Sequence, residues 1–86
     1  MNTLREWVEL LAKEGVPLPD SVRLGDRDDE GTLSWTEGPH SLELELTPGI
    51  SPSFFYRNRK SSEVLMEDPV EMVIPPLIVQ KLKHFK

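Results

Sequence analysis

The sequence predicts a single α+β domain over residues 1–86, built from an N-terminal helix, an antiparallel β-meander of four to five strands and a C-terminal helix. Three observations support this fold class. Apolar residues recur at helical spacing over 3–14, they alternate with polar residues over 31–47, and helical spacing returns over 76–85. A chain of this length holds one core, which buries roughly 60 to 65% of the surface that the unfolded chain exposes.

A capping box predicts the start of the first helix. The Thr3 hydroxyl can accept a hydrogen bond from the amide of Glu6, and the Glu6 side chain can reach back to the amide of Thr3. The apolar residues that follow share one helical face; they are Leu4, Trp7, Val8 and Leu11. Gly15 can adopt the left-handed conformation that ends a helix, and Pro17 prevents its continuation. We therefore expect a helix over 3–14, with Trp7 packed in the core.

The segment 31–47 predicts a β-hairpin with one apolar face and one acidic face. Glu37 would pair with His40 across the Gly38-Pro39 turn, because glycine suits a tight turn and proline cannot extend a strand. Apolar residues then meet apolar residues, and polar residues meet glutamates. The predicted pairs are Trp35 with Leu42, Leu33 with Leu44, Ser34 with Glu43, and Thr32 with Glu45. A shift by one residue would place leucines on the polar face, so the pattern specifies this register.

Three weaker patterns predict further strands around this hairpin. Together with the hairpin, the expected strands span about 21–25, 31–37, 41–47, 52–58 and 62–67. In the fourth strand, Phe54, Phe55 and Tyr56 follow one another without alternation. Either both faces of this strand are covered, or Phe54 and Tyr56 face the core and Phe55 is exposed as an interaction site.

The pattern near the C-terminus predicts a second helix over about 76–85. Its apolar residues at helical spacing are Leu77, Ile78, Leu82 and Phe85. Basic side chains gather toward its end, where positive charge is favourable. This helix can pack on its own sheet or dock in a groove of a partner; the first is favoured because so small a domain needs its apolar surface for its own core.

The composition excludes several classes of protein. Without cysteine there is no disulfide framework, no thiolate nucleophile and no zinc–cysteine site, which favours a reducing cytoplasm. No apolar run approaches the roughly 18 residues that span a bilayer, and residues 1–15 are amphipathic and carry acids, so we expect no membrane contact and no export. His40 and His84 have no carboxylate spaced to orient them, and the glycines are scattered, so we expect neither an enzyme nor a cofactor.

The charge is unevenly distributed along the chain, whose net charge is −5. Residues 1–50 hold eleven acids and four bases, whereas residues 51–86 hold four acids and six bases. An acidic first half would repel the phosphates of nucleic acid and attract a basic surface. We therefore expect no direct binding of nucleic acid, and a protein partner that is itself basic, such as a nucleic-acid-binding protein.

One acidic segment, residues 26–37, matches most of a calcium-loop pattern. Asp26, Asp28 and Glu30 occupy positions one, three and five, glycine occupies position six, and Glu37 occupies position twelve. Calcium binding by these four carboxylates is therefore one hypothesis. The strand predicted to begin at Gly31 would carry Glu37 away from Asp26, so an acidic hairpin loop that serves turn formation and solubility is the favoured interpretation.

The combined pattern resembles a group of short uncharacterised proteins of bacterial genomes and mobile elements. The residues that carry the resemblance are a leading helix, a Leu-Pro connector, Gly31-Thr32-Leu33-Ser34-Trp35, the run Leu42-Glu43-Leu44-Glu45-Leu46 and an aromatic strand, over about 17–57. The resemblance implies a prokaryotic or phage accessory protein, and it brings no activity with it.

The leading functional hypothesis is a non-enzymatic protein-binding module, such as an anti-CRISPR or antitoxin-like inhibitor, that presents a negative surface to a basic partner. The residues expected to bind the partner are Asp26, Asp28, Asp29, Glu30, Glu43, Glu45 and Phe55. A calcium-binding domain is one alternative. The other is a structural or self-associating unit, a homodimer formed through Phe54, Phe55 and the terminal helix.

Overall fold

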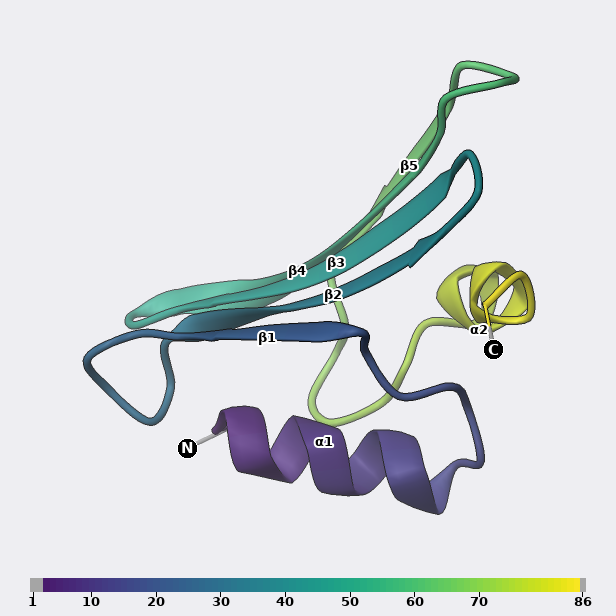
Figure 1. Cartoon of the computed structure of the whole chain (residues 1–86). Coiled ribbons are helices and arrows are strands. Elements are labelled where there is room, and N and C mark those ends of the chain that lie inside the picture. Colours follow the sequence, from purple (N-terminus) through teal and green to yellow (C-terminus); the bar gives the residue numbers. More distant parts are fainter. Residues whose placement is uncertain (1–2, 86) are drawn as a thin grey trace.

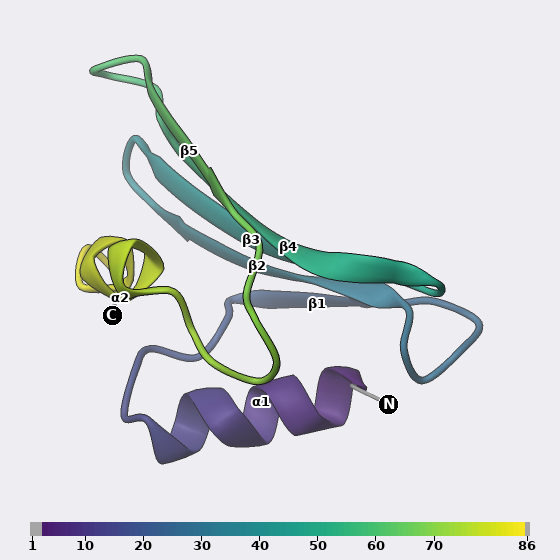
Figure 2. The same ribbon diagram turned by 180° about the vertical axis from the view of Figure 1, so that it is seen from behind.

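A computed structural model describes residues 3–85 and shows an α+β fold with an antiparallel meander (Figure 1). The elements in chain order are α1 (Leu4–Lys13), β1 (Ser21–Leu24), β2 (Gly31–Glu37), β3 (His40–Thr47), β4 (Ile50–Asn58), β5 (Glu63–Glu67) and α2 (Pro76–Leu82). The five strands lie side by side in the order in which they follow one another along the chain. Both helices lie on the same side of this sheet (Figures 1 and 2).

The start and end of α1 follow the predicted signals. The Thr3 hydroxyl accepts a hydrogen bond from the Glu6 amide at 3.2 Å, and Glu6 Oε1 accepts one from the Thr3 amide at 2.8 Å. Gly15 adopts the left-handed conformation, with φ of 72°. Three residues of the apolar stripe, Leu4, Trp7 and Leu11, are buried against the sheet.

The central hairpin has the register that the sequence predicts. β2 and β3 pair Trp35 with Leu42, Leu33 with Leu44, Ser34 with Glu43, Thr32 with Glu45 and Glu37 with His40. Alternate residues point toward the helices and are buried. The remaining residues form the open face of the sheet, which neither of the helices within residues 3–85 covers; its members include Thr32, Ser34, Glu43, Glu45, Phe55, Val64 and Met66.

Strand β4 settles the orientation of the three aromatic residues. Phe54 and Tyr56 are fully buried, and Phe55 is half-buried on the open face beside Glu43. The register between β3 and β4 shifts between Glu45 and Thr47, where two residues of β4 oppose one of β3. Pro52 lies in this bulge, where the lack of a backbone N–H is tolerated. The sheet continues to Ile50, two residues before the expected start of the strand.

The core forms between the sheet and the two helices. The rings of Trp7 and Phe54 pack edge to face, with 5.7 Å between ring centroids and 85° between planes. Trp35 donates its indole N–H to the Pro17 carbonyl at 2.8 Å, which fixes the connector between α1 and β1 against the sheet. The fully buried Trp7 indole N–H has no hydrogen-bond partner among residues 3–85.

Helix α2 packs on its own sheet, and Ile78, Leu82 and Phe85 are buried there. The helix ends at Leu82, three residues before the expected end. The next amides, from Lys83 to Phe85, each donate to the carbonyl three residues earlier, so the last turn is tightened.

A group of rings holds the end of this helix on the sheet. The imidazole rings of His84 and His40 stack in parallel with 4.3 Å between centroids, and His40 Nδ1 lies 2.6 Å from the Tyr56 hydroxyl in a hydrogen bond. The Lys81 ammonium lies 5.0 Å from the centre of the Tyr56 ring and 2.6 Å from a carboxylate oxygen of Glu63. These contacts join α2 to three strands of the sheet.

Three other strand limits differ from the prediction by one residue. β3 begins at His40, one residue before its expected start. β1 ends at Leu24, and Gly25 is the first residue of the loop that follows. β5 begins at Glu63, because Ser62 has φ of 63°, a left-handed conformation that a strand does not accommodate. No helix within residues 3–85 is both long and apolar enough to cross a membrane.

Candidate functional site

The acidic loop between β1 and β2 is held by its own side chains. Glu30 Oε1 accepts a hydrogen bond from the Asp26 amide at 3.0 Å, and the backbone of Glu30 closes the loop on Gly25 and Arg27. Arg27 Nε donates to Asp29 Oδ1 at 3.2 Å. Two of the loop's four carboxylates therefore have partners within the loop itself.

The loop is also attached to the start of α1. The Leu4 amide donates to the Asp28 carbonyl at 3.0 Å. Gly31, the first residue of β2, has φ of 151° and lies under the Leu4 side chain. A Cβ atom at Gly31 would lie 2.4 Å from Leu4 Cδ1 and 2.4 Å from the carbonyl oxygen of Arg23, so only glycine fits here. This contact fixes the position of the acidic loop relative to the helix.

The four carboxylates of the calcium-loop pattern do not converge. Glu37 lies at the far end of β2, opposite His40, and is six steps along an extended strand from Gly31. At about 3.3 Å per residue this is about 20 Å. Glu30 is engaged with the backbone of the loop. Within residues 3–85 no three carboxylate, histidine or cysteine side chains lie close enough together to hold a metal ion.

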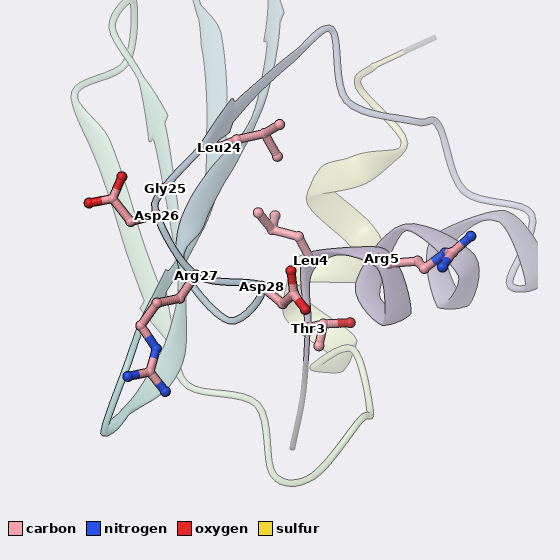
Figure 3. A pocket seen from close by; sticks show the side chains of 8 residues that line it. All are labelled: Thr3, Leu4, Arg5, Leu24, Gly25, Asp26, Arg27 and Asp28. Atoms are coloured by element: carbon pink, nitrogen blue, oxygen red, sulfur yellow. The ribbon is translucent and has the colours of Figure 1, made fainter.

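A depression of about 450 Å³ lies between this loop and the start of α1 (Figure 3). The side chains of Leu4 and Leu24 approach each other across it, and Asp28 lies beside Thr3 at its edge (Figure 3). Asp26 also borders the depression, from the loop (Figure 3). It therefore combines an apolar floor with the Asp28 carboxylate at its rim, while the Asp26 side chain points away from Leu4 and Leu24 (Figure 3).

Smaller depressions continue from this one around the end of the sheet. One of about 200 Å³ shares Leu24 with the first and brings Glu30 of the loop together with Glu45 of β3. The next lies on the open face, shares Glu45, and adds Glu43. Asp29 borders a further depression at the β3–β4 turn.

The structure thus places six of the seven predicted partner-binding residues along adjoining depressions, which begin at one end of the sheet and reach Glu43 in the middle of β3. We call this region the acidic end; its carboxylates are Asp26, Asp28, Asp29, Glu30, Glu43 and Glu45. Three arginines border the same depressions, namely Arg5, Arg23 and Arg27. The carboxylates outnumber the guanidinium groups two to one, so the region remains negative.

Phe55 is the seventh predicted residue, and the structure places it outside these depressions. It lies on the open face between Glu43 of β3 and Met66 of β5, and it is half-buried. It therefore belongs to an apolar row on the opposite half of the sheet from the acidic loop.

Two exposed aliphatic residues complete the acidic end, and the sequence did not single them out. Leu24 is 75% exposed between the first two depressions, and Ile50 is 68% exposed beside Asp29. Leu24 is exposed because β1 is an edge strand whose four residues are all exposed, and its cross-strand partner Gly31 adds no side chain beside it. An aliphatic residue at the end of a short first strand is the sequence signal that could have identified it.

No protein-family model, no curated protein and no solved structure matches the chain.

Proposed function

We propose that the protein is a non-enzymatic protein-binding module whose acidic end docks on a basic surface of a partner. The observation that supports this proposal is the exposed Leu24, which lies between depressions bordered by Asp26, Asp28, Glu30 and Glu45. An apolar anchor with a polar, charged rim is the usual arrangement of a protein interface.

Apolar contact and charge have different tasks in this proposal. Burying the exposed three quarters of Leu24 would contribute about 1 to 2 kcal/mol to the affinity. The carboxylates accelerate the encounter with a basic partner and disfavour acidic ones, and this contribution weakens as salt is added.

A basic nucleic-acid-binding protein is the class of partner that fits this charge. Occupation of its basic site by the acidic end would exclude nucleic acid, which is the action of an anti-CRISPR or antitoxin-like inhibitor. The resemblance of residues 17–57 to proteins of bacterial genomes and mobile elements supports such an accessory role. The absence of cysteine supports action in the reducing cytoplasm.

Capture of partners from lysate of the native host tests the proposal when three bait proteins are compared. The first is the unchanged chain, and the second carries Glu43→Lys and Glu45→Lys. The third carries Glu9→Lys and Glu14→Lys, which make the same change in net charge at exposed positions of α1 and its cap, away from the acidic end. Leu24→Asp in a fourth bait removes the apolar anchor and keeps the negative charge.

We expect a basic protein to be captured by the unchanged chain and by the α1 variant, and to be lost from the other two. Its capture by the unchanged chain should also decrease between about 0.05 and 0.5 M salt. Equal capture by all four baits, or capture that salt does not change, would contradict docking through the acidic end. Absence of any specifically captured protein would contradict the proposal as a whole.

A further inference from the structure

Strand β5 forms one edge of the sheet. It pairs with β4 along its five residues, and no strand within residues 3–85 pairs with its other side. The free side of an edge strand presents backbone N–H and C=O groups that can pair with a strand of another chain. Proteins often block such an edge with a proline or a bulge. β5 contains no proline and its register with β4 is regular, so the edge is open to pairing.

The middle of β5 is self-complementary in an antiparallel pair. Val64 and Met66 lie on the open face and are 57% and 63% exposed, and Leu65 lies between them on the other side. If a second β5 pairs antiparallel about Leu65, each Val64 lies opposite a Met66, and the two Leu65 side chains lie opposite each other. Directly opposite side chains come within about 5 Å of each other, so all three central positions bring apolar groups together.

Positive charge gathers at the end of β5 that is next to the β4–β5 turn. Arg57 near the end of β4, and Arg59 and Lys60 in the turn, are exposed. Lys81 of α2 reaches the same end, where its ammonium lies 2.6 Å from a carboxylate oxygen of Glu63. Four cations therefore accompany one carboxylate, which is already paired, so this end of the strand is basic.

The other end of β5 is acidic. Glu67 is the last residue of the strand and Asp68 follows it, and neither carboxylate forms an ion pair with a residue in the described range 3–85. In the antiparallel pair, Glu67 of one copy lies opposite Glu63 of the other, beside Lys81 of that copy. The acidic end of each copy thus meets the basic end of the other, twice in one interface, and these charges favour a second copy in this orientation.

We propose that two copies of the chain pair antiparallel through β5, about Leu65, and form one continuous sheet with five strands from each copy. The interface is isologous, since the same residues of both copies form it. It differs from a dimer built on Phe54 and the terminal helix, because Phe54, Ile78 and Leu82 are buried in the chain's own core.

The edge formed by β1 is less suited to the same pairing. Antiparallel pairing of two β1 strands about Arg23, which brings Val22 opposite Leu24, would also place two guanidinium groups opposite each other. Because β5 lies at the edge opposite β1, its pairing leaves the acidic end of both copies free. The inference therefore stands apart from the proposed function.

Sedimentation equilibrium of the chain measures the association. Two five-residue strands form a small interface, so dimer should accumulate between about 0.01 and 1 mM chain. Val64→Lys combined with Met66→Lys places lysines opposite each other and should abolish the dimer. Val22→Lys combined with Leu24→Lys makes the same change at exposed positions of β1 and should leave the dimer unchanged.

Two results of this measurement would overturn the proposal. One is an unchanged chain that remains a monomer at about 1 mM. The other is a dimer that persists in the variant of Val64 and Met66. Both positions are exposed in the single chain, so circular dichroism should show that this variant keeps its fold.

Cysteine substitutions test the register, since the chain has no cysteine of its own. Val64→Cys in one copy lies opposite Met66→Cys in the other, whereas identical positions are offset by two residues along the strands. That offset exceeds the roughly 7 Å between Cα atoms that a disulfide can bridge. A mixture of the two variants under mild oxidation should therefore form the mixed disulfide about tenfold faster than either variant links to itself. Absence of a preference for the mixed disulfide would overturn the register.

Charge reversal tests the orientation of the two copies. Glu67→Lys should weaken the dimer about tenfold, because the substitution acts at both ends of the interface. Glu9→Lys makes the same charge change at an exposed position of α1 and should leave the affinity unchanged. An equal effect of the two substitutions would show that net charge alone governs association, and it would overturn the antiparallel pair.

Discussion

The two faces of the sheet are made by alternate residues of the same strands, and they differ in almost every physical respect. Toward the helices, residues such as Phe54, Leu42 and Leu44 are fully buried in one continuous core. Their immediate neighbours Phe55 and Glu43 lie on the face that is turned away from both α1 and α2. Stability is therefore concentrated on one face, which leaves the residues of the other face free to be used for binding.

The matched substitutions Phe54→Ala and Phe55→Ala should separate the two faces most clearly. Loss of Phe54 removes the ring that meets Trp7 and leaves a cavity, so the free energy of unfolding should fall by about 3 to 5 kcal/mol. Loss of the half-buried Phe55 should lower it by about 1 kcal/mol, because one side of that ring already contacts solvent. Urea denaturation of the two variants measures the difference, and equal losses would mean that the open face is covered in solution.

Gly31→Ala should cause the second-largest decrease in the free energy of unfolding. The new methyl group would clash with Leu4 and with the Arg23 carbonyl in a backbone conformation that L residues avoid, at a cost of about 2 to 3 kcal/mol. Gly49→Ala is the control, because Gly49 also has positive φ but has no atom within 4 Å of the added carbon. Its cost should be about 1 kcal/mol, from backbone strain alone. If denaturation shows equal costs, the contact of Leu4 with Gly31 contributes nothing.

His84→Ala should have a smaller effect, confined to the C-terminal end of the covered face. The stack on His40 would be lost, which costs about 1 kcal/mol for a pair of rings. Hydrogen exchange should accelerate in residues 76–85 more than in the strands. Lys83→Ala removes an exposed neighbour and should change neither the free energy of unfolding nor the rate of hydrogen exchange in residues 76–85. If hydrogen exchange accelerates similarly in that variant, the stacked imidazoles do not hold the helix.

The smallest change in stability should come from Glu43→Lys combined with Glu45→Lys. Both side chains are exposed on the open face, so the free energy of unfolding should change by less than about 0.5 kcal/mol. A melting temperature within a few degrees of that of the unchanged chain would show this. It would also show that the double variant is folded and can be used in the binding test. A loss comparable with that of Phe54→Ala would mean that these carboxylates support the fold.

The sequence predicts the sheet well where the pattern is local. The alternation of Leu33 and Trp35 with polar residues, and the glycine at the turn, determine both the faces and the register of the central hairpin. The three adjacent aromatics left two orientations open, and only the covered face of the finished sheet decides between them. The end of α2 was misplaced because three-residue hydrogen bonds tighten its last turn, which helical spacing does not reveal.

The candidate surface was predicted only in part, because the spacing of residues along the sequence does not show which residues from distant segments lie close together in the fold. The carboxylates were recognised singly, and the predicted hairpin register accounts for Glu30 and Glu45 bordering one depression. The position of Asp28 beside the start of α1 depends on how the β1–β2 loop folds against the helix, which no local pattern reveals. Gly31 was predicted as the first residue of a strand, but the sequence does not reveal that Leu4 contacts the sheet at this position. The stack of His40 on His84 joins residues more than forty positions apart, which no local pattern could indicate.

The matching order of strands in the chain and in the sheet has a consequence for the speed of folding. Each strand reaches its neighbour by closing a connection of two to six residues, and no strand waits for a distant partner. The entropy lost in closing such short loops is small, and folding is faster where contacts are more local, so pairing between consecutive strands favours rapid formation of the sheet. The sheet can therefore grow outward from its central hairpin, with the two helices docking from opposite ends of the chain onto a surface that is already assembled.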